Sequence, residues 1–173
     1  MKKSRAVALS AVLSALGVVL LFIGSASQVL DLSCAALASI ITVFAVIELK
    51  GVWPFLIYAV TSALSLLLLP DKFAALIYLL FAGYYPMLKN TVEKLRKPVI
   101  EWIIKLAVFN AALTGVVWAS REILKLPDDE LIGLTWAVYL LGNAVFALYD
   151  VALTRLISLY LFNLRKRFKF LNK

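Results

Sequence analysis

Lys105 and Asp150 are ionisable residues inside long apolar stretches of this chain. Charged groups within a membrane are costly and are usually paired. Glu101 lies one helical turn before Lys105, and Arg155 follows Asp150 by five residues. If the two segments are antiparallel neighbours, Lys105 and Asp150 lie at similar depth, so we expect a structural ion pair. A proton or cation relay is the alternative, but it would favour a carboxylate deeper in the membrane.

A second group of residues could hold a small flat ligand. Trp136, Tyr139 and Asn143 are spaced three and four apart and therefore share one helix face. Asn110 and Thr114 are four apart on the preceding segment. Two aromatic rings and an amide offer stacking and a directional hydrogen bond to a polar ligand. The alternative is a belt of interfacial aromatic residues, favoured for Trp136, with an Asn110–Asn143 bond between helices.

Two aspartates lie in turns on the same side as this second group. Asp31 follows the first apolar segment, and Asp71 belongs to the Pro70-Asp71-Lys72 turn after the third. We expect that both could complete or gate a ligand pocket.

The residue types that most enzymes use are scarce. The chain has one cysteine, Cys34, and no histidine. An intramolecular disulfide and a cysteine metal cluster are therefore excluded, and the usual general base is missing. No phosphate-binding GxxxxGK[ST] loop occurs. We expect neither an enzyme nor a bound metal or cofactor.

The composition indicates an all-α integral membrane protein of one domain. Of 173 residues, 64% are hydrophobic and 16% are charged, and the mean hydropathy is +0.96. A soluble fold of this size could not bury so much apolar surface. The net charge of +8 does not indicate nucleic-acid binding, because the basic residues cluster at the ends of apolar segments. They are typical of topology determinants at an anionic lipid surface.

Six transmembrane helices are predicted, joined mostly by short connections. Their ranges are roughly 6–24, 33–49, 52–69, 73–88, 99–120 and 131–160. The first follows a basic start and resembles a secretory signal, but its 19 residues exceed the ~7–15 of a signal core. We expect it to be retained as a helix, with cleavage left open.

The run 89–98 divides the chain into four segments and two. Four of its ten residues are Lys or Arg, so we expect it to lie in water on the cytoplasmic side. With six spans, this side would hold thirteen basic residues and the opposite side three. Both termini are therefore predicted to be cytoplasmic.

The first segment contains a row of small residues. Ala11 and Ala15 are four apart, with Ala8 one turn earlier, and such spacing lets helix backbones approach closely in lipid. The row could pack within its own bundle or form a docking groove for a partner's helix.

The opening RAVALSAVLSALGVVLLFIG, with its basic start and Ala-x-x-x-Ala, resembles the substrate-binding (S) subunits of energy-coupling factor transporters. The size, the six-span plan and the cytoplasmic termini are also similar. The resemblance implies a bacterial plasma membrane protein that captures a vitamin-sized molecule. It also implies that Ala11 and Ala15 meet a transmembrane coupling subunit, which works with ATPase subunits.

Two other function classes are alternatives to a substrate-capture subunit. A scaffolding membrane subunit, similar to small rod-shape morphogenesis proteins, would have a comparable size and no ligand pocket. An intramembrane enzyme is the weakest hypothesis, since the sequence has no serine–histidine or metal set.

Overall fold

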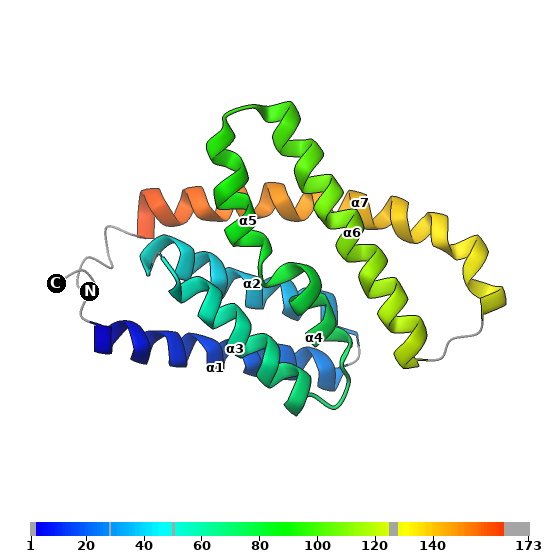
Figure 1. The fold of residues 1–173 in the computed structure, drawn as a ribbon, viewed down its shortest axis with the longest axis horizontal. Helices are drawn as coiled ribbons and strands as arrows, with labels where there is room; N and C mark the ends of the chain where they lie inside the picture. Colours follow the sequence, from blue (N-terminus) through cyan, green and yellow to red (C-terminus); the bar gives the residue numbers. More distant parts are fainter. Residues whose placement is uncertain (1–2, 28, 50, 125–127, 165–173) are drawn as a thin grey trace.

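The computed structural model describes residues 3–27, 29–49, 51–124 and 128–164. Side chains are described for 3–27, 29–49, 51–119 and 136–162. All regular elements in this part of the chain are helices, as predicted. Figure 1 shows a block of three helices, a broken segment that crosses it, and a long helical hairpin.

The three-helix block consists of α1 (Lys3–Ser27), α2 (Asp31–Glu48) and α3 (Trp53–Leu68). α1 packs against both of the others. A Cβ atom on Gly17 would lie 2.9 Å from the Thr61 side chain, and one on Gly24 would lie 2.8 Å from Cys34 Cβ. Glycine at these two positions therefore lets α1 lie close to α3 and α2.

The fourth predicted helix, 73–88, is not continuous. It consists of α4 (Phe73–Ile77), the π-helical turn η1 (Tyr78–Ala82) and α5 (Tyr85–Val92), followed by the 3-10 turn η2 (Glu93–Leu95). The break falls at Gly83, where a Cβ atom would lie 2.5 Å from the Tyr58 ring. Pro86 is in the first turn of α5, where its missing N–H costs nothing.

The chain closes with a hairpin of two long helices. α6 (Pro98–Leu124) extends the predicted range 99–120 at both ends. α7 (Asp128–Leu159) begins before the predicted range 131–160, and the π-helical turn η3 (Tyr160–Leu164) continues it.

 α7 (Asp128–Leu159) runs alongside α2 and packs against α6. Of the two hairpin helices, α7 therefore lies beside the three-helix block, whereas α6 packs against α4, η1 and α7 (Figure 1).

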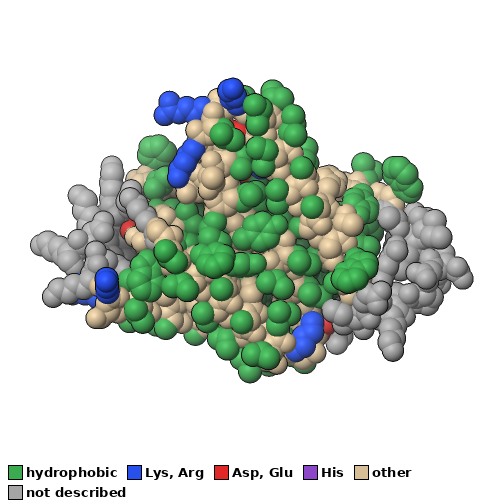
Figure 2. Space-filling model, viewed as in Figure 1, with side chains coloured by type: hydrophobic (Ala, Val, Ile, Leu, Met, Phe, Trp, Pro, Cys, Tyr) green, Lys and Arg blue, Asp and Glu red, His purple; other side chains and the backbone are tan. Residues whose placement is uncertain are grey.

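Four helices in the described part are long and apolar enough to cross a membrane. They are α1, α2, the Pro98–Ala119 part of α6 and the Trp136–Phe162 stretch of α7 and η3. α3 is apolar but shorter. Large apolar side chains cover much of the visible outer surface (Figure 2), as expected where lipid is the solvent. The protein is an all-helical membrane protein.

The basic run 89–98 lies only partly in water. α5 continues to Val92, and Lys89 is 1% exposed, whereas Lys94, Arg96 and Lys97 are exposed. The prediction that the whole run lies in water is therefore wrong for Lys89. Its charge is compensated by carboxylates inside the protein, so it does not need hydration.

Candidate functional site

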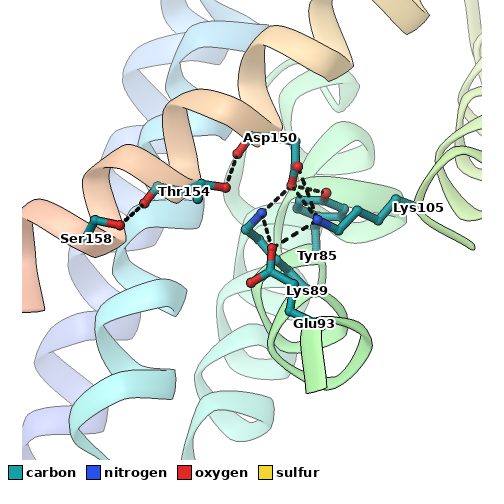
Figure 3. A network of polar contacts seen from close by, with 7 residues as sticks. All are labelled: Tyr85, Lys89, Glu93, Lys105, Asp150, Thr154 and Ser158. Carbon is teal, nitrogen blue, oxygen red and sulfur yellow. Dashed lines mark hydrogen bonds and ion pairs between the residues drawn. The ribbon is translucent and has the colours of Figure 1, made fainter. Parts of the chain in front are cut away.

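A cluster of buried charges joins α5, α6 and α7 (Figure 3). Asp150 on α7 lies 2.5 Å from Lys89 on α5 and 3.2 Å from Lys105 on α6. Glu93 lies 2.6 Å from Lys89 and 3.0 Å from Lys105. The Tyr85 hydroxyl donates to Asp150 at 2.6 Å. The expected pair of Lys105 and Asp150 is thus present, within a larger cluster.

The cluster is balanced in charge, and all of its side chains except that of Glu93 are buried. Lys105 and Asp150 are each 4% exposed, whereas the Glu93 side chain is 40% exposed. Two ammonium groups face two carboxylates, so each buried charge has a partner of opposite sign. This arrangement is suited to holding three elements together. Arg155 and Glu101, which were grouped with this pair by sequence, are exposed and half-buried respectively.

Sequence reasoning missed Tyr85, Lys89 and Glu93 as members of the cluster. The three are spaced by four residues, which places them on one face of a helix. That spacing could have identified the three residues as members of one helix face. The spacing was missed because the run 89–98, which holds both Lys89 and Glu93, was assigned to an aqueous loop.

A layer of aromatic rings lies directly against the cluster. Phe109 and Phe146 stack with centroids 4.6 Å apart and planes at 12°, and Phe81 meets both edge-on. The ring of Tyr85 packs against Phe81 and Tyr149. This layer connects η1 and α5 with α6 and α7.

Beyond the aromatic layer is a half-enclosed cavity of about 420 Å³ between α2, α4, η1 and the α6–α7 hairpin. In the wall of the cavity, Gly142 lets α7 lie close to α6, since a Cβ atom there would lie 3.1 Å from Leu113. The described residues that line it are Leu32, Ala36, Phe73, Ile77, Phe81, Ala82, Phe109, Ala112, Leu113, Val116, Val138, Leu141, Gly142, Val145, Phe146 and Tyr149.

The predicted ligand platform is engaged in bonds between helices. The Asn110 and Asn143 amides donate to each other at 2.9 and 3.1 Å. The Thr114 and Tyr139 hydroxyls are 2.7 Å apart. None of these four residues is among the described residues that line the cavity. The geometry is that of the alternative interpretation, in which the amides join α6 to α7.

The other residues assigned to the ligand site are also outside the described cavity lining. Trp136 is exposed, as a belt residue would be. Asp31 is buried at the start of α2, and its Oδ1 has no hydrogen-bond partner among the described residues. The Asp71 carboxylate accepts from the Phe73 N–H, and the Asp71 backbone bonds to Ser25.

α1 carries two rows of small residues on different faces. Ser10, Ser14 and Gly17 are buried against the bundle, whereas Ala11 and Ala15 are exposed. Packing among the described helices therefore uses the serine and glycine row and leaves the alanine row free.

No family model, no curated protein and no solved structure matches this chain.

Proposed function

We propose that this protein is the substrate-capture subunit of an uptake transporter for a vitamin or other micronutrient, energised by a separate ATPase complex. The observation that supports this most directly is the exposed alanine row of α1. The proposal extends to a cell-membrane location, bacterial by the resemblance of its first helix.

The exposed row suits the docking of a partner's helix. Ala8, Ala11 and Ala15 follow one another at intervals of three and four, and all are exposed. Val12 and Leu16 beside them are more than half exposed. In lipid, a row of small residues between larger apolar ones lets a second helix approach closely and gain van der Waals contact.

We further propose six membrane crossings with both ends of the chain in the cytoplasm. The first described residues of α1 and the last of η3 lie at the same end of the molecule (Figure 1). α3 has 16 residues and is about 24 Å long, shorter than the ~30 Å hydrocarbon core. Local thinning of the bilayer would accommodate it. The α4–η1–α5 segment would provide the fourth crossing.

The cavity gives the capture role a place for cargo. Its volume of about 420 Å³ falls in the usual range of small-molecule sites, ~300–1,000 Å³. It lies beside the start of α2, at the opposite end of that helix from Glu48. In the proposed orientation the cavity therefore faces the outer half of the membrane, where cargo arrives.

The experiment is purification of the tagged protein from its native host in mild detergent, followed by mass spectrometry of the proteins that accompany it. We expect a transmembrane coupling subunit and ATPase subunits. Ala11→Leu and Ala15→Leu should each abolish their recovery while leaving the protein folded, because a bulky side chain prevents close helix approach.

The matched control is Ala152→Leu, the same substitution at an exposed position on α7. It should leave recovery of the partners unchanged. Undiminished recovery with both α1 variants would remove the docking role from the alanine row. Cell-wall synthesis or cytoskeletal partners in place of an ATPase would favour the scaffolding alternative.

A further inference from the structure

The lining of the cavity restricts the chemistry of its ligand. Every described lining residue is apolar except Tyr149, whose hydroxyl is 2.6 Å from the Ser39 hydroxyl. A polar ligand group placed here would lose its hydration and find no new partner among these side chains. That loss costs roughly 1–3 kcal/mol for each unpaired group. A flat polar vitamin is therefore a poor fit.

Aromatic rings give the lining a second property. Phe73, Phe81, Phe109, Phe146 and Tyr149 all contribute to it. Ring faces and edges pack well against other π-systems, in stacked or edge-on geometry. A ligand with an aromatic or conjugated body would gain more from this wall than a saturated one.

The volume limits the size of the ligand. An apolar cavity of ~150 Å³ holds one benzene molecule. About 420 Å³ is nearly three times that space, which corresponds to roughly 17 carbon atoms by the same measure, and the half-enclosed shape lets a slightly longer molecule project from the mouth.

We propose that the cavity binds an uncharged lipophilic molecule of this size, with an aromatic or conjugated body, as the cargo of the transporter. The claim that this molecule is transported as cargo rests on the proposed function. The binding site itself is argued from the cavity alone.

A membrane phospholipid is a weaker candidate for the occupant. No cation or amide is present among the described lining residues to hold a phosphate headgroup. The buried ammonium groups among the described residues, on Lys89 and Lys105, lie beyond the aromatic layer and are already paired with carboxylates. Two acyl chains would also exceed the volume.

The test uses the full chain in lipid nanodiscs and radiolabelled retinol, an uncharged molecule with a ring and a conjugated chain. Binding is measured by equilibrium dialysis, with protein-free nanodiscs subtracted. We expect saturable binding of one retinol per protein. Thiamine and riboflavin, which are flat and polar, should neither bind nor compete.

Two variants fill the cavity, and each has a matched control on α3. Val145→Phe is paired with Val60→Phe, since the two valines are 45% and 44% exposed. Ala36→Leu is paired with Ala63→Leu, at an exposed alanine. Filling the space should weaken retinol binding at least about tenfold, because overpacking costs ~1–3 kcal/mol. Both controls should bind within about twofold of the parent protein, because a side chain that faces lipid displaces no ligand.

Several results would overturn the proposal. One is equal retinol affinity in the filled variants and their controls. A second is saturable binding of thiamine or riboflavin in place of retinol. A third is crosslinking of a phospholipid with a diazirine in its acyl chain to cavity residues, unaffected by retinol.

The two proposals can fail separately. Recovery of ATPase subunits without retinol binding would overturn the ligand class and keep the proposed function. Retinol binding by a protein that recovers no ATPase would keep the site and remove transport.

Discussion

Asp150 is the residue on which the buried charge cluster depends. It is the only carboxylate among the described residues of the cluster that is itself buried, and both lysines and Tyr85 bond to it. Removing one partner of a buried ion pair is costly because the other charge stays buried without compensation. The cost should therefore depend strongly on which carboxylate is neutralised.

Asp150→Asn should destabilise the protein by about 3–5 kcal/mol, because Lys89 and Lys105 would then share only the half-exposed Glu93. Cys34 is the single cysteine and is buried, so a thiol-reactive fluorophore reports unfolding directly. Thermal unfolding in detergent would show a large fall in the midpoint.

Glu93→Gln is the control for this prediction, since it neutralises a carboxylate of the same cluster that is 40% exposed. It should lower the midpoint much less, because both lysines keep Asp150 as a partner and the half-exposed Glu93 contributes an ion pair that water already screens. An Asp150→Asn midpoint equal to that of the parent protein would show that the cluster does not hold the three elements together.

The two helices of the α6–α7 hairpin are joined at several points by polar bonds and close packing. The Asn110–Asn143 pair and the Thr114–Tyr139 contact lie on it, and Lys105 meets Asp150 further along. Gly142 lets α7 approach Leu113 and Phe109 on α6. The polar residues that sequence spacing offered as a ligand platform therefore position the helices that line the cavity.

Asn143→Ala should lower stability and leave retinol affinity within about twofold, because the amide pairs with Asn110 and does not line the cavity. In a double-mutant cycle with Asn110→Ala, the coupling energy should be about 0.6 kcal/mol, up to ~1.7 kcal/mol. Unfolding of the single variants and of the double variant measures it. A ligand-affinity loss with unchanged stability would restore the platform interpretation.

The whole molecule has different chemistry on the two sides of its aromatic layer. The charge cluster and the exposed basic residues near Arg96 lie on one side of the aromatic layer, and the apolar cavity lies on the other. Because Lys and Arg are retained on the cytoplasmic side of a membrane, the charged end should face inward and the cavity outward.

Labelling of single cysteines tests this orientation. In a Cys34→Ala background, Val29→Cys should react with an impermeant maleimide in intact cells, because Val29 is exposed in the turn before α2. Leu95→Cys, exposed in η2, should react only after the cells are permeabilised. Labelling of Leu95→Cys in intact cells would invert the proposed topology.

The class of protein and part of its polar chemistry could be predicted from the sequence alone. Long apolar runs and the placement of Lys and Arg are local properties, so they indicate membrane helices before any packing is known. The pairing of Lys105 with Asp150 was also predictable, because an isolated charge within a membrane is too costly to leave unpaired.

The tertiary structure decided which face of each helix meets which neighbour. On α1 the serine–glycine row and the alanine row have similar spacing, and only the close approach of Gly17 to Thr61 shows which one faces inward. The break at Gly83 sets the direction of α5 and so buries Lys89. The cavity is the space enclosed between α2, α4, η1 and the α6–α7 hairpin. Because such a space belongs to several distant segments at once, no single stretch of sequence encodes it.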